Sequence, residues 1–323
     1  MPANTLRVPS VVKLKEEVQD TIYNFSPTDA PLVSMIGSSS IGNVFFEWQR
    51  DVYRAANKDN AAVEGADASY AAIVQPGLLN NRTQIFQDSF NISGTSEAVK
   101  KYGRAAEKKL KLMKVAVELK KDQDAAFIAS GVTVTDNGTL AGKARGLYGF
   151  FTKGTFGATG ANPDPTTNTN ATSGTDRALT ETMIKDAQQS CYENGGDGSI
   201  LMCSPAHKVK ISSFTFGVSR THEVSTVVGK DVQPFSYDFI KGDFGIIKIV
   251  PNRNQAISAV GLNDTLYMFD ADKLERAVLR PYQVTELAKV GDADTYQVLT
   301  EASLRVKDER TCYAIRDITV SGS

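Results

Sequence analysis

The sequence predicts an α+β protein that is elongated rather than compact. Three patterns predict this class. Two segments with the period-two alternation of β-strands flank a stretch of alanine and small polar residues. A long segment with helical periodicity follows them. A small region of alternating helix and strand then precedes a β-rich end.

The composition fits a folded protein and excludes some classes. Of the 323 residues, 41% are apolar and 23% are charged, with 36 basic residues against 37 acidic ones. Since the net charge is near zero, no global attraction to nucleic acid or to an anionic membrane is expected. The three cysteines show no paired spacing, and the sequence shows neither a signal peptide nor the ~18-residue apolar run of a membrane span. We therefore expect a soluble protein made in a reducing cytoplasm.

Residues 1–42 predict an extended N-terminal arm. Its last part, FSPTDAPLVSMIGSSSIG, contains two prolines and a serine run, and its apolar residues are too interrupted for a packed unit. A disordered tail is the alternative, but the apolar residues favour an arm that docks on another surface.

Residues 43–93 predict an extended loop with β-structure at both ends. Val44, Phe46 and Trp48 recur at every second position, and the segment 85–92 alternates in the same way. We expect these two strands to pair as a long hairpin with a soft tip around 57–80. An isolated two-stranded ribbon is marginal in water, so its aromatic residues need cover, which another copy of the chain could supply.

Residues 94–153 predict one long helix, over 95–130, followed by strand and turn. Apolar residues recur at steps of three and four through Met113 and Val117, and Gly131 can end the helix. The segment 95–124 carries nine basic and five acidic residues. This excess indicates either a solvated helix face or a surface that faces nucleic acid without reading its sequence.

The rest of the chain divides into three parts. Residues 154–175 are low in complexity and predict a flexible loop. Residues 176–267 predict a small α/β unit, with a helix that Ser204 caps. In the β-rich end, 268–323, we expect the strand 295–306 to turn at KDER and to return as an antiparallel hairpin.

Few residues could carry chemistry. Cys203 and His207 could form a metal site or a catalytic pair, but no further ligand pattern completes either, and we expect a buried cysteine beside a surface histidine. Neither a phosphate-binding GxxxxGK[ST] loop nor a GxSxG nucleophile motif occurs. We expect no enzyme, no metal and no cofactor, and a hydrolase using Cys203 and His207 is the minor alternative.

The order of these segments resembles the major capsid proteins of tailed bacteriophages, which have the Hong Kong 97-type fold. FSPTDAPLVSMIG followed by FFEWQRD is similar to the arm and loop entry of a family of phage head proteins. The stretch from Leu266, with LRP at 279–281 and LAKVGD at 287–292, is similar to the C-terminal block of the same family. Those relatives more often have a polar residue where this chain has Val290.

The resemblance implies a structural protein that self-assembles through hexamers and pentamers into the icosahedral head around double-stranded DNA. The alternative is an encapsulin-like nanocompartment shell. The implied parts are an N-terminal arm at 1–42, an extended loop at 43–93, a peripheral domain at 94–153 with a spine helix over 95–130, a flexible loop at 154–175, an axial domain at 176–267 and the C-terminal hairpin of the peripheral domain at 268–323.

Two sets of site residues follow from these roles. The expected subunit contacts are Phe46, Trp48, Arg50, Arg54, Arg82, Phe86 and Phe90, with the aromatic residues covered largely by other copies. The expected DNA-facing residues are Lys108, Lys109, Lys111 and Lys114. Further implied partners are portal, scaffolding or decoration proteins, with no membrane, in a virion assembled in the host cytoplasm.

Overall fold

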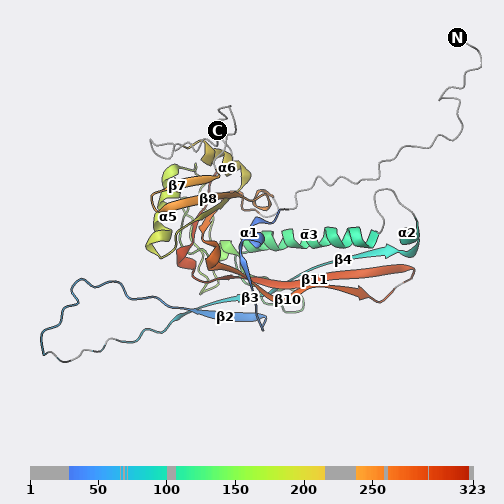
Figure 1. Ribbon diagram of the computed structural model, residues 1–323, viewed down its shortest axis with the longest axis horizontal. Helices are drawn as coiled ribbons and strands as arrows, with labels where there is room; N and C mark the ends of the chain where they lie inside the picture. Colours follow the sequence, from blue (N-terminus) through green and yellow to red (C-terminus); the bar gives the residue numbers. More distant parts are fainter. Residues whose placement is uncertain are drawn as a thin grey trace, which may run out of the picture.

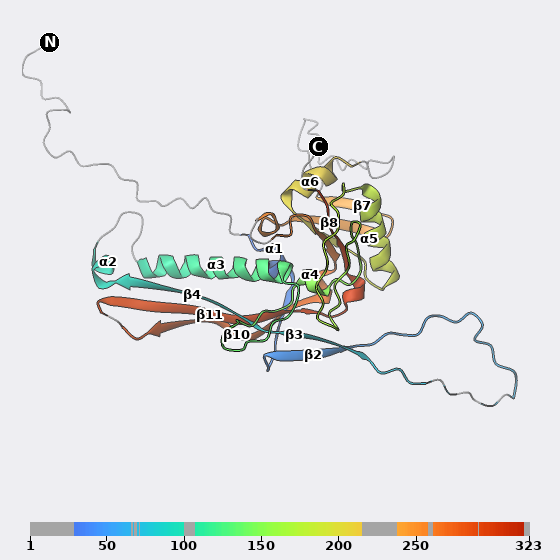
Figure 2. The ribbon, with the colours of Figure 1, turned by 180° about the vertical axis from the view of Figure 1, so that it is seen from behind.

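The computed structural model describes residues 29–65, 67, 70, 72–99, 107–214, 238–257, 261–289 and 291–319. Figure 1 shows an elongated part made of a long helix on a sheet, a more compact part at one end of it, and a thin ribbon that projects away from both. Figure 2 shows the same arrangement from behind. Most of the expected N-terminal arm, residues 1–28, lies outside the described residues.

The elongated part is a four-stranded sheet covered on one face by the helix α3, Glu107–Ala129. Val115, Leu119 and Phe127 of α3 are buried in the core of this part. The strand order is β1-β10-β11-β4, with β1 parallel to β10 and the other neighbours antiparallel. The strands are β1 Gly37–Ser40, β4 Gln84–Ser93, β10 Leu274–Leu287 and β11 Ala293–Val306.

The single helix expected over 95–130 is wrong at its beginning. A short helix, α2 Gly94–Ala98, starts where the Ser93 hydroxyl accepts a hydrogen bond from the Ser96 amide at 3.2 Å. It ends at Val99, whose backbone is extended, and α3 is described from Glu107. The Ser93 hydroxyl therefore caps a short helix that is separate from α3.

The expected apolar stripe of α3 is also wrong in its phase. Met113 is 57% exposed and Val117 is 36% exposed, whereas Val115 and Leu119 are 2% exposed. The sheet selects the stripe of Val115, Leu119 and Phe127, and leaves Met113 and Val117 on the outer side of the helix.

The compact part is a six-stranded sheet with the order β5-β12-β9-β6-β8-β7. One face of this sheet is covered by two helices, α5 Glu181–Glu193 and α6 Pro205–Ser212. Ile184 and Ala187 of α5 are buried against it. The opposite face joins the core of the elongated part through Met202 and Tyr267. The strands are β5 Gly154–Thr155, β6 Ile200–Cys203, β7 Phe239–Gly242, β8 Gly245–Pro251, β9 Leu266–Phe269 and β12 Tyr313–Ile315.

Short helical turns complete the described chain. The helix α4, Leu147–Phe150, packs into the core of the elongated part. Three 3₁₀ turns lie beside the strands, η2 Asn254–Ala256, η3 Ala271–Lys273 and η4 Glu309–Thr311. The expected cap of α6 is confirmed, because the Ser204 hydroxyl accepts from the His207 amide at 3.5 Å.

The expected C-terminal hairpin is wrong. After β11 the chain passes through η4, and β12 pairs with β9 and β5 instead of returning along β11. Both edges of β11 are already occupied, by β10 and by β4. The apolar residues Ala314 and Ile315 are instead fully buried in the six-stranded sheet.

The segment 154–175, which the sequence predicts to be a flexible loop, forms hydrogen bonds within the chain. Two isolated bridges, Ala161–Thr172 and Asp164–Thr169, close it. The Gly157 amide donates to the Asp317 carboxylate at 2.9 Å, which fixes the start of the segment to the end of the chain.

The ribbon pairs differently from the expectation. β2, Phe45–Arg50, is antiparallel to β3, Gly77–Arg82, whereas β4 lies on β11. The strands expected over 44–49 and 85–92 are therefore not partners. Thr83 separates β3 from β4, and there the chain leaves the ribbon and enters the four-stranded sheet.

The described end of the arm docks on the chain itself. The helix α1, Pro31–Met35, buries Leu32 and Val33 in the core, and the Val33 amide donates to the buried Asp124 carboxylate at 3.1 Å. β1 then adds a parallel strand to β10. This part of the arm therefore finds its surface within the same protomer.

Candidate subunit-contact site

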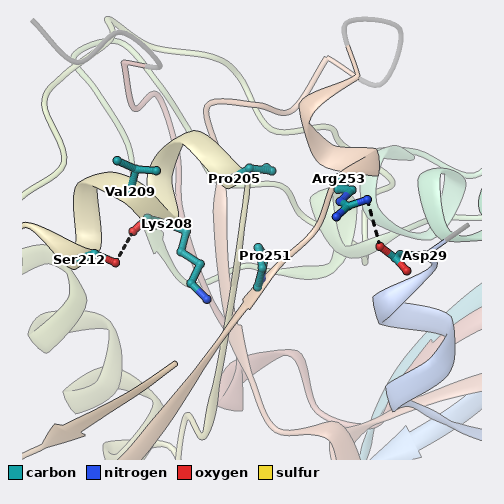
Figure 3. Close-up of a pocket in the computed structure, with 7 residues that line it drawn as sticks. All are labelled: Asp29, Pro205, Lys208, Val209, Ser212, Pro251 and Arg253. Carbon is teal, nitrogen blue, oxygen red and sulfur yellow. Dashed lines mark hydrogen bonds and ion pairs between the residues drawn. The ribbon is translucent and has the colours of Figure 1, made fainter. Parts of the chain in front are cut away.

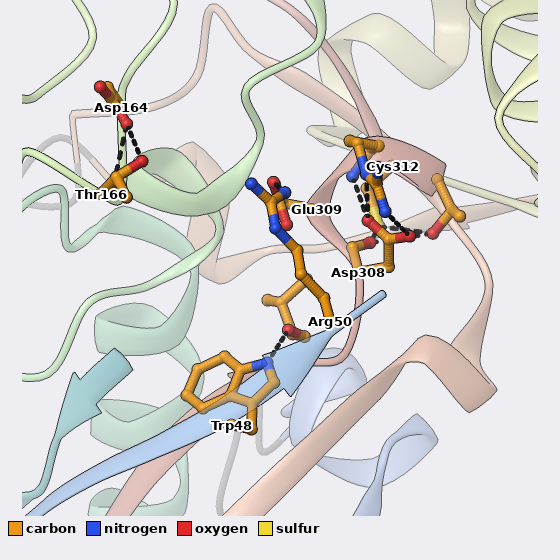
Figure 4. Close-up of polar contacts among 10 residues, drawn as sticks. Trp48, Arg50, Asp164, Thr166, Asp308, Glu309 and Cys312 are labelled. Atoms are coloured by element: carbon orange, nitrogen blue, oxygen red, sulfur yellow. Dashed lines mark hydrogen bonds and ion pairs between the residues drawn. The ribbon is translucent and has the colours of Figure 1, made fainter. Parts of the chain in front are cut away.

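The base of the ribbon is fixed to the body by its aromatic residues. Trp48 stacks on Phe46 with ring centroids 5.6 Å apart, and its indole N–H donates to the Val306 carbonyl at 2.9 Å (Figure 4). The Arg305 guanidinium lies over both rings, at 5.5 Å from Phe46 and 6.0 Å from Trp48. Phe46 is only 8% exposed. Its cover comes from the chain itself, which corrects the expectation that another copy covers it.

A charged contact holds the end of β2. Arg50 forms an ion pair with Glu309 of η4, whose side chain is 3% exposed (Figure 4). Burial lowers the pKa of Arg50, and the nearby Arg310 lowers it further. Arg310 is itself held by two contacts to Asp308, each at 2.9 Å. The ribbon is therefore anchored at the point where it leaves the body.

The second strand of the ribbon is anchored by an asparagine that the sequence analysis missed. The Asn81 amide group is fully buried and donates to the Arg145 carbonyl at 3.0 Å and to the Leu304 carbonyl at 2.6 Å. In return, the Arg145 amide donates to Asn81 Oδ1 at 2.8 Å. Leu79, two residues earlier, is 1% exposed. The alternation of Leu79 and Asn81 could have predicted this strand, but Leu79 lies in the segment 57–80, which was expected to be the soft tip.

Arg145 is a buried cation at this anchor. Its guanidinium donates to the Asn168 side chain at 2.8 Å and lies over the Phe150 ring at 5.1 Å. Burial lowers its pKa to about 10, an effect that the charge of Asp164 partly opposes. Asn168 thus links the segment 154–175 to the base of the ribbon.

Beyond these anchors the loop 51–76 carries apolar side chains without cover in the described chain. Arg54 in this loop is exposed as well. In both views the loop extends away from the body (Figures 1 and 2). An exposed apolar set on a projecting loop marks an interaction surface. Its members and their exposed fractions are Val52 61%, Tyr53 100%, Val63 80%, Tyr70 95%, Ile73 89% and Val74 85%.

The other expected contact residues lie on the body. Phe86 is 6% exposed and meets Phe127 edge-on at 6.2 Å, and Phe90 is half-buried beside Tyr296 at 5.6 Å. Both rings point toward α3, which corrects the expectation that other copies cover them. Arg82 lies over the Phe45 ring at 4.9 Å, at the surface of the ribbon.

The four expected DNA-facing lysines do not form one face of α3. The Lys108 ammonium lies 4.0 Å from the centre of the Tyr296 ring, on the sheet side. Lys109, Lys111 and Lys114 are exposed. At 3.6 residues per turn, Lys109 and Lys111 point in directions about 160° apart. The exposed positive charge is therefore spread around the helix.

The catalytic alternative has no accessible nucleophile. Cys203 is fully buried, and burial raises the pKa of its thiol to about 12. His207 is 2% exposed, which corrects the expected surface position, and burial lowers its pKa. Its Nδ1 lies 2.9 Å from the Ser204 hydroxyl, which is also buried. These groups therefore cannot meet a substrate in this conformation.

One cavity of about 410 Å³ opens beside α6 (Figure 3). The Arg253–Asp29 pair, at 3.6 Å, lies at one side of it, and Lys208 points into it from α6. The other lining residues are Pro205, Val209, Ser212 and Pro251. Within the described ranges, no group of three or more His, Cys, Asp or Glu could hold a metal ion. None of the described helices is both long and apolar enough to span a membrane.

Comparisons with known proteins agree with the geometry. A family model described as SU10 major capsid protein matches residues 2–319. The major capsid protein of Escherichia phage Phieco32 is 29% identical over 317 residues, which covers 87% of each chain.

Solved structures show the same fold at low identity. The capsid of a native GTA particle has a TM-score of 0.65 at 12% identity, covering 97% of this chain and 98% of the other. The SrpI encapsulin of Synechococcus elongatus PCC 7942 has a TM-score of 0.58 at 10% identity, covering 98% and 97%. The fold is therefore the Hong Kong 97 type, which confirms the expected class. Because the family model matches nearly the whole length, the chain belongs to the SU10 family of phage major capsid proteins.

Proposed function

We propose that the chain forms the icosahedral head of a phage through hexamers and pentamers, and that the loop 51–76 of each copy lies on a neighbouring copy. One observation carries the proposal. The base of the ribbon is fixed by Trp48, Arg50 and Asn81, whereas the apolar residues of the loop have no cover in the described chain. A base anchored to the body with an uncovered apolar end suits a contact between subunits.

The loop is tested by deletion. Replacing residues 52–75 with a short Gly-Ser linker keeps both strands of the ribbon, including the buried Leu79. We expect negative-stain microscopy to show no closed shells, while circular dichroism shows a folded subunit. A matched variant with Tyr53, Tyr70 and Ile73 changed to Ser keeps the length of the loop and should also fail to close shells. Normal shells from both variants would overturn the role of the loop.

The proposal includes double-stranded DNA as the enclosed partner. Lys109, Lys111 and Lys114 are exposed and could contact phosphates without reading sequence. Changing these three to Gln should reduce DNA retention in filled heads and lower its salt dependence. Lys108→Gln is the control, because the Lys108 ammonium already lies against the Tyr296 ring. Equal DNA retention in the triple variant would favour a solvated helix face.

The proposed setting is assembly in the host cytoplasm, with portal, scaffolding or decoration proteins as further partners. A nanocompartment shell is the second candidate, supported by the likeness to an encapsulin, which is one of fold alone. The family match and the curated relative favour the phage head. Heads that fill with DNA during infection would support the first candidate, whereas shells that hold only protein cargo would support the second.

A further inference from the structure

We propose that two surfaces of the compact part join neighbouring copies head to tail around a ring. The first, which we call the sheet surface, consists of Phe239, Lys241, Ile246 and Lys248. The second, which we call the corner surface, consists of Tyr192, Glu193, Asp243 and Phe244. The inference rests on the proposed function, and it names the side chains through which copies in a hexamer or a pentamer meet.

The sheet surface lies on the edge of the six-stranded sheet. β7 is the last strand, and its register with β8 places Phe239 opposite Lys248 and Lys241 opposite Ile246. Phe239 is 60% exposed, Ile246 is 63% exposed, and both lysines are exposed. Neither lysine forms an ion pair with the part of the chain that the structure describes. The surface therefore combines two apolar side chains with two unneutralised positive charges.

The corner surface is formed where the β7–β8 turn meets the end of α5. Tyr192 of α5 stacks on Phe244 of the turn, with ring centroids 4.9 Å apart and 26° between the planes. The exposed fractions are 54% for Tyr192 and 39% for Phe244. Glu193 and Asp243 are exposed beside them, and neither forms an ion pair among the described residues. The nearest cation to Asp243 is Lys185, which is paired with Glu181 at 2.7 Å. This surface therefore combines two aromatic rings with an excess of negative charge.

The two surfaces face different directions. Ile240 and Ile247 point toward α5, because both are buried with Ile184 and Ala187 of that helix. Since side chains alternate along a strand, Lys241 and Ile246 point to the opposite face. The turn bends toward α5, where the charge of Asp243 adds to the effect of Glu181 in raising the pKa of Lys185. The two surfaces therefore lie on different sides of one hairpin, which favours a contact between unlike patches over a two-fold dimer.

The chemistry of the surfaces indicates a second copy of this chain as the partner. Positive charges with apolar neighbours complement negative charges with aromatic neighbours, and such complementarity fixes the orientation of a contact. A contact between unlike patches of identical subunits produces a ring when the rotation closes. Nucleic acid would suit the two lysines, but it would not explain the apolar side chains beside them or the acidic counterpart.

Charge reversal tests the inference on the full-length chain. Lys241→Glu with Lys248→Glu makes both surfaces negative, and Glu193→Lys with Asp243→Lys makes both positive. We expect each variant to raise the concentration needed for assembly by about tenfold or more, measured by sedimentation and negative-stain microscopy. The chain that carries all four changes should assemble again. Lys143→Glu with Lys153→Glu is the matched control, because both residues are exposed and lie elsewhere.

Mixing the two reversed variants gives a second, sharper readout. In an equimolar mixture, unlike copies attract and like copies repel, so a ring must alternate between them. Six-membered rings can alternate, but five-membered rings cannot. We therefore expect the mixture to recover hexamers without closed shells, since closure needs pentamers.

The outcomes separate this inference from the proposed function. Normal shells from the unaltered chain and from both reversed variants would overturn the two surfaces and leave the capsid function standing. Failure of the four-change chain to assemble, with circular dichroism showing a folded subunit, would also overturn them. An unaltered chain that forms neither rings nor shells would overturn the proposed function, and this inference with it.

Discussion

The ion pair between Arg50 and Glu309 should contribute strongly to the attachment of the ribbon. In Arg50→Ala, the Glu309 carboxylate loses its cation and stays buried, because its side chain is 3% exposed. Breaking a buried ion pair from one side typically costs about 3–5 kcal/mol. The Arg50 side chain is 24% exposed, so water screens part of the interaction. We therefore expect a loss of about 2–3 kcal/mol in the free energy of unfolding.

The opposite change should cost less. Glu309→Gln keeps the shape of the side chain, and the released guanidinium can be hydrated through its exposed part, so we expect about 1 kcal/mol. The double variant should then cost at least about 1 kcal/mol less than the sum of the two single changes, because neither charge is left buried alone.

The measurement is urea unfolding of unassembled subunits, followed by the fluorescence of Trp48. This residue is the only tryptophan of the chain, and it stacks on Phe46 at the base of the ribbon. Arg54→Ala is the control, since Arg54 is exposed in the loop. A cost below about 0.5 kcal/mol for Arg50→Ala, or strict additivity in the double variant, would refute the reasoning.

Three further predictions follow from buried polar groups. Asn81→Ala should lower the free energy of unfolding by about 2–3 kcal/mol in the same urea assay, because the Arg145 and Leu304 carbonyls lose their donor; a loss equal to that of Asn80→Ala would contradict this. Burial raises the pKa of Asp124 in the folded protein, despite hydrogen bonds from Asn254 and Asn252. The contribution of Asp124 to the free energy of unfolding is therefore fully present below its unfolded pKa of about 4 and is lost as the pH rises through its folded pKa. The stability of the unaltered chain relative to Asp124→Asn should therefore fall as the pH rises above about 4 on urea titration, and a rise would reverse the sign of the argument. Cys203 should not react with a thiol reagent at about pH 8 until the protein unfolds, because burial holds its thiol pKa at about 12; labelling of the native protein, read by mass spectrometry, would contradict its burial.

The sequence by itself determined the fold class and many local elements. Period-two alternation located β2, and the Ser204-Pro205 pair located the start of α6. Ile184, Ala187 and Cys191 recur at steps of three and four, which is the spacing of the buried face of α5. These signals are local, because a cap or a stripe needs only neighbours within a few residues.

The sequence did not determine which strands pair or which helix face is buried. Val115 and Val117 are equally suitable for a buried stripe, and only the position of the sheet leaves Val117 exposed and Val115 enclosed. Likewise, β4 has a pattern that either β2 or β11 could pair with. The choice depends on segments far away in the chain, such as β10, which occupies the other edge of β11.

The same limit applies to the candidate site. The aromatic residues of the loop entry were visible in the sequence, but their cover was not. Phe46 and Phe86 are sheltered by contacts with Arg305 and Phe127, which lie 259 and 41 residues further along the chain. Burial is a property of the three-dimensional arrangement, so only the tertiary structure could show that these rings are sheltered within the chain while the apolar side chains of the loop 51–76 are exposed.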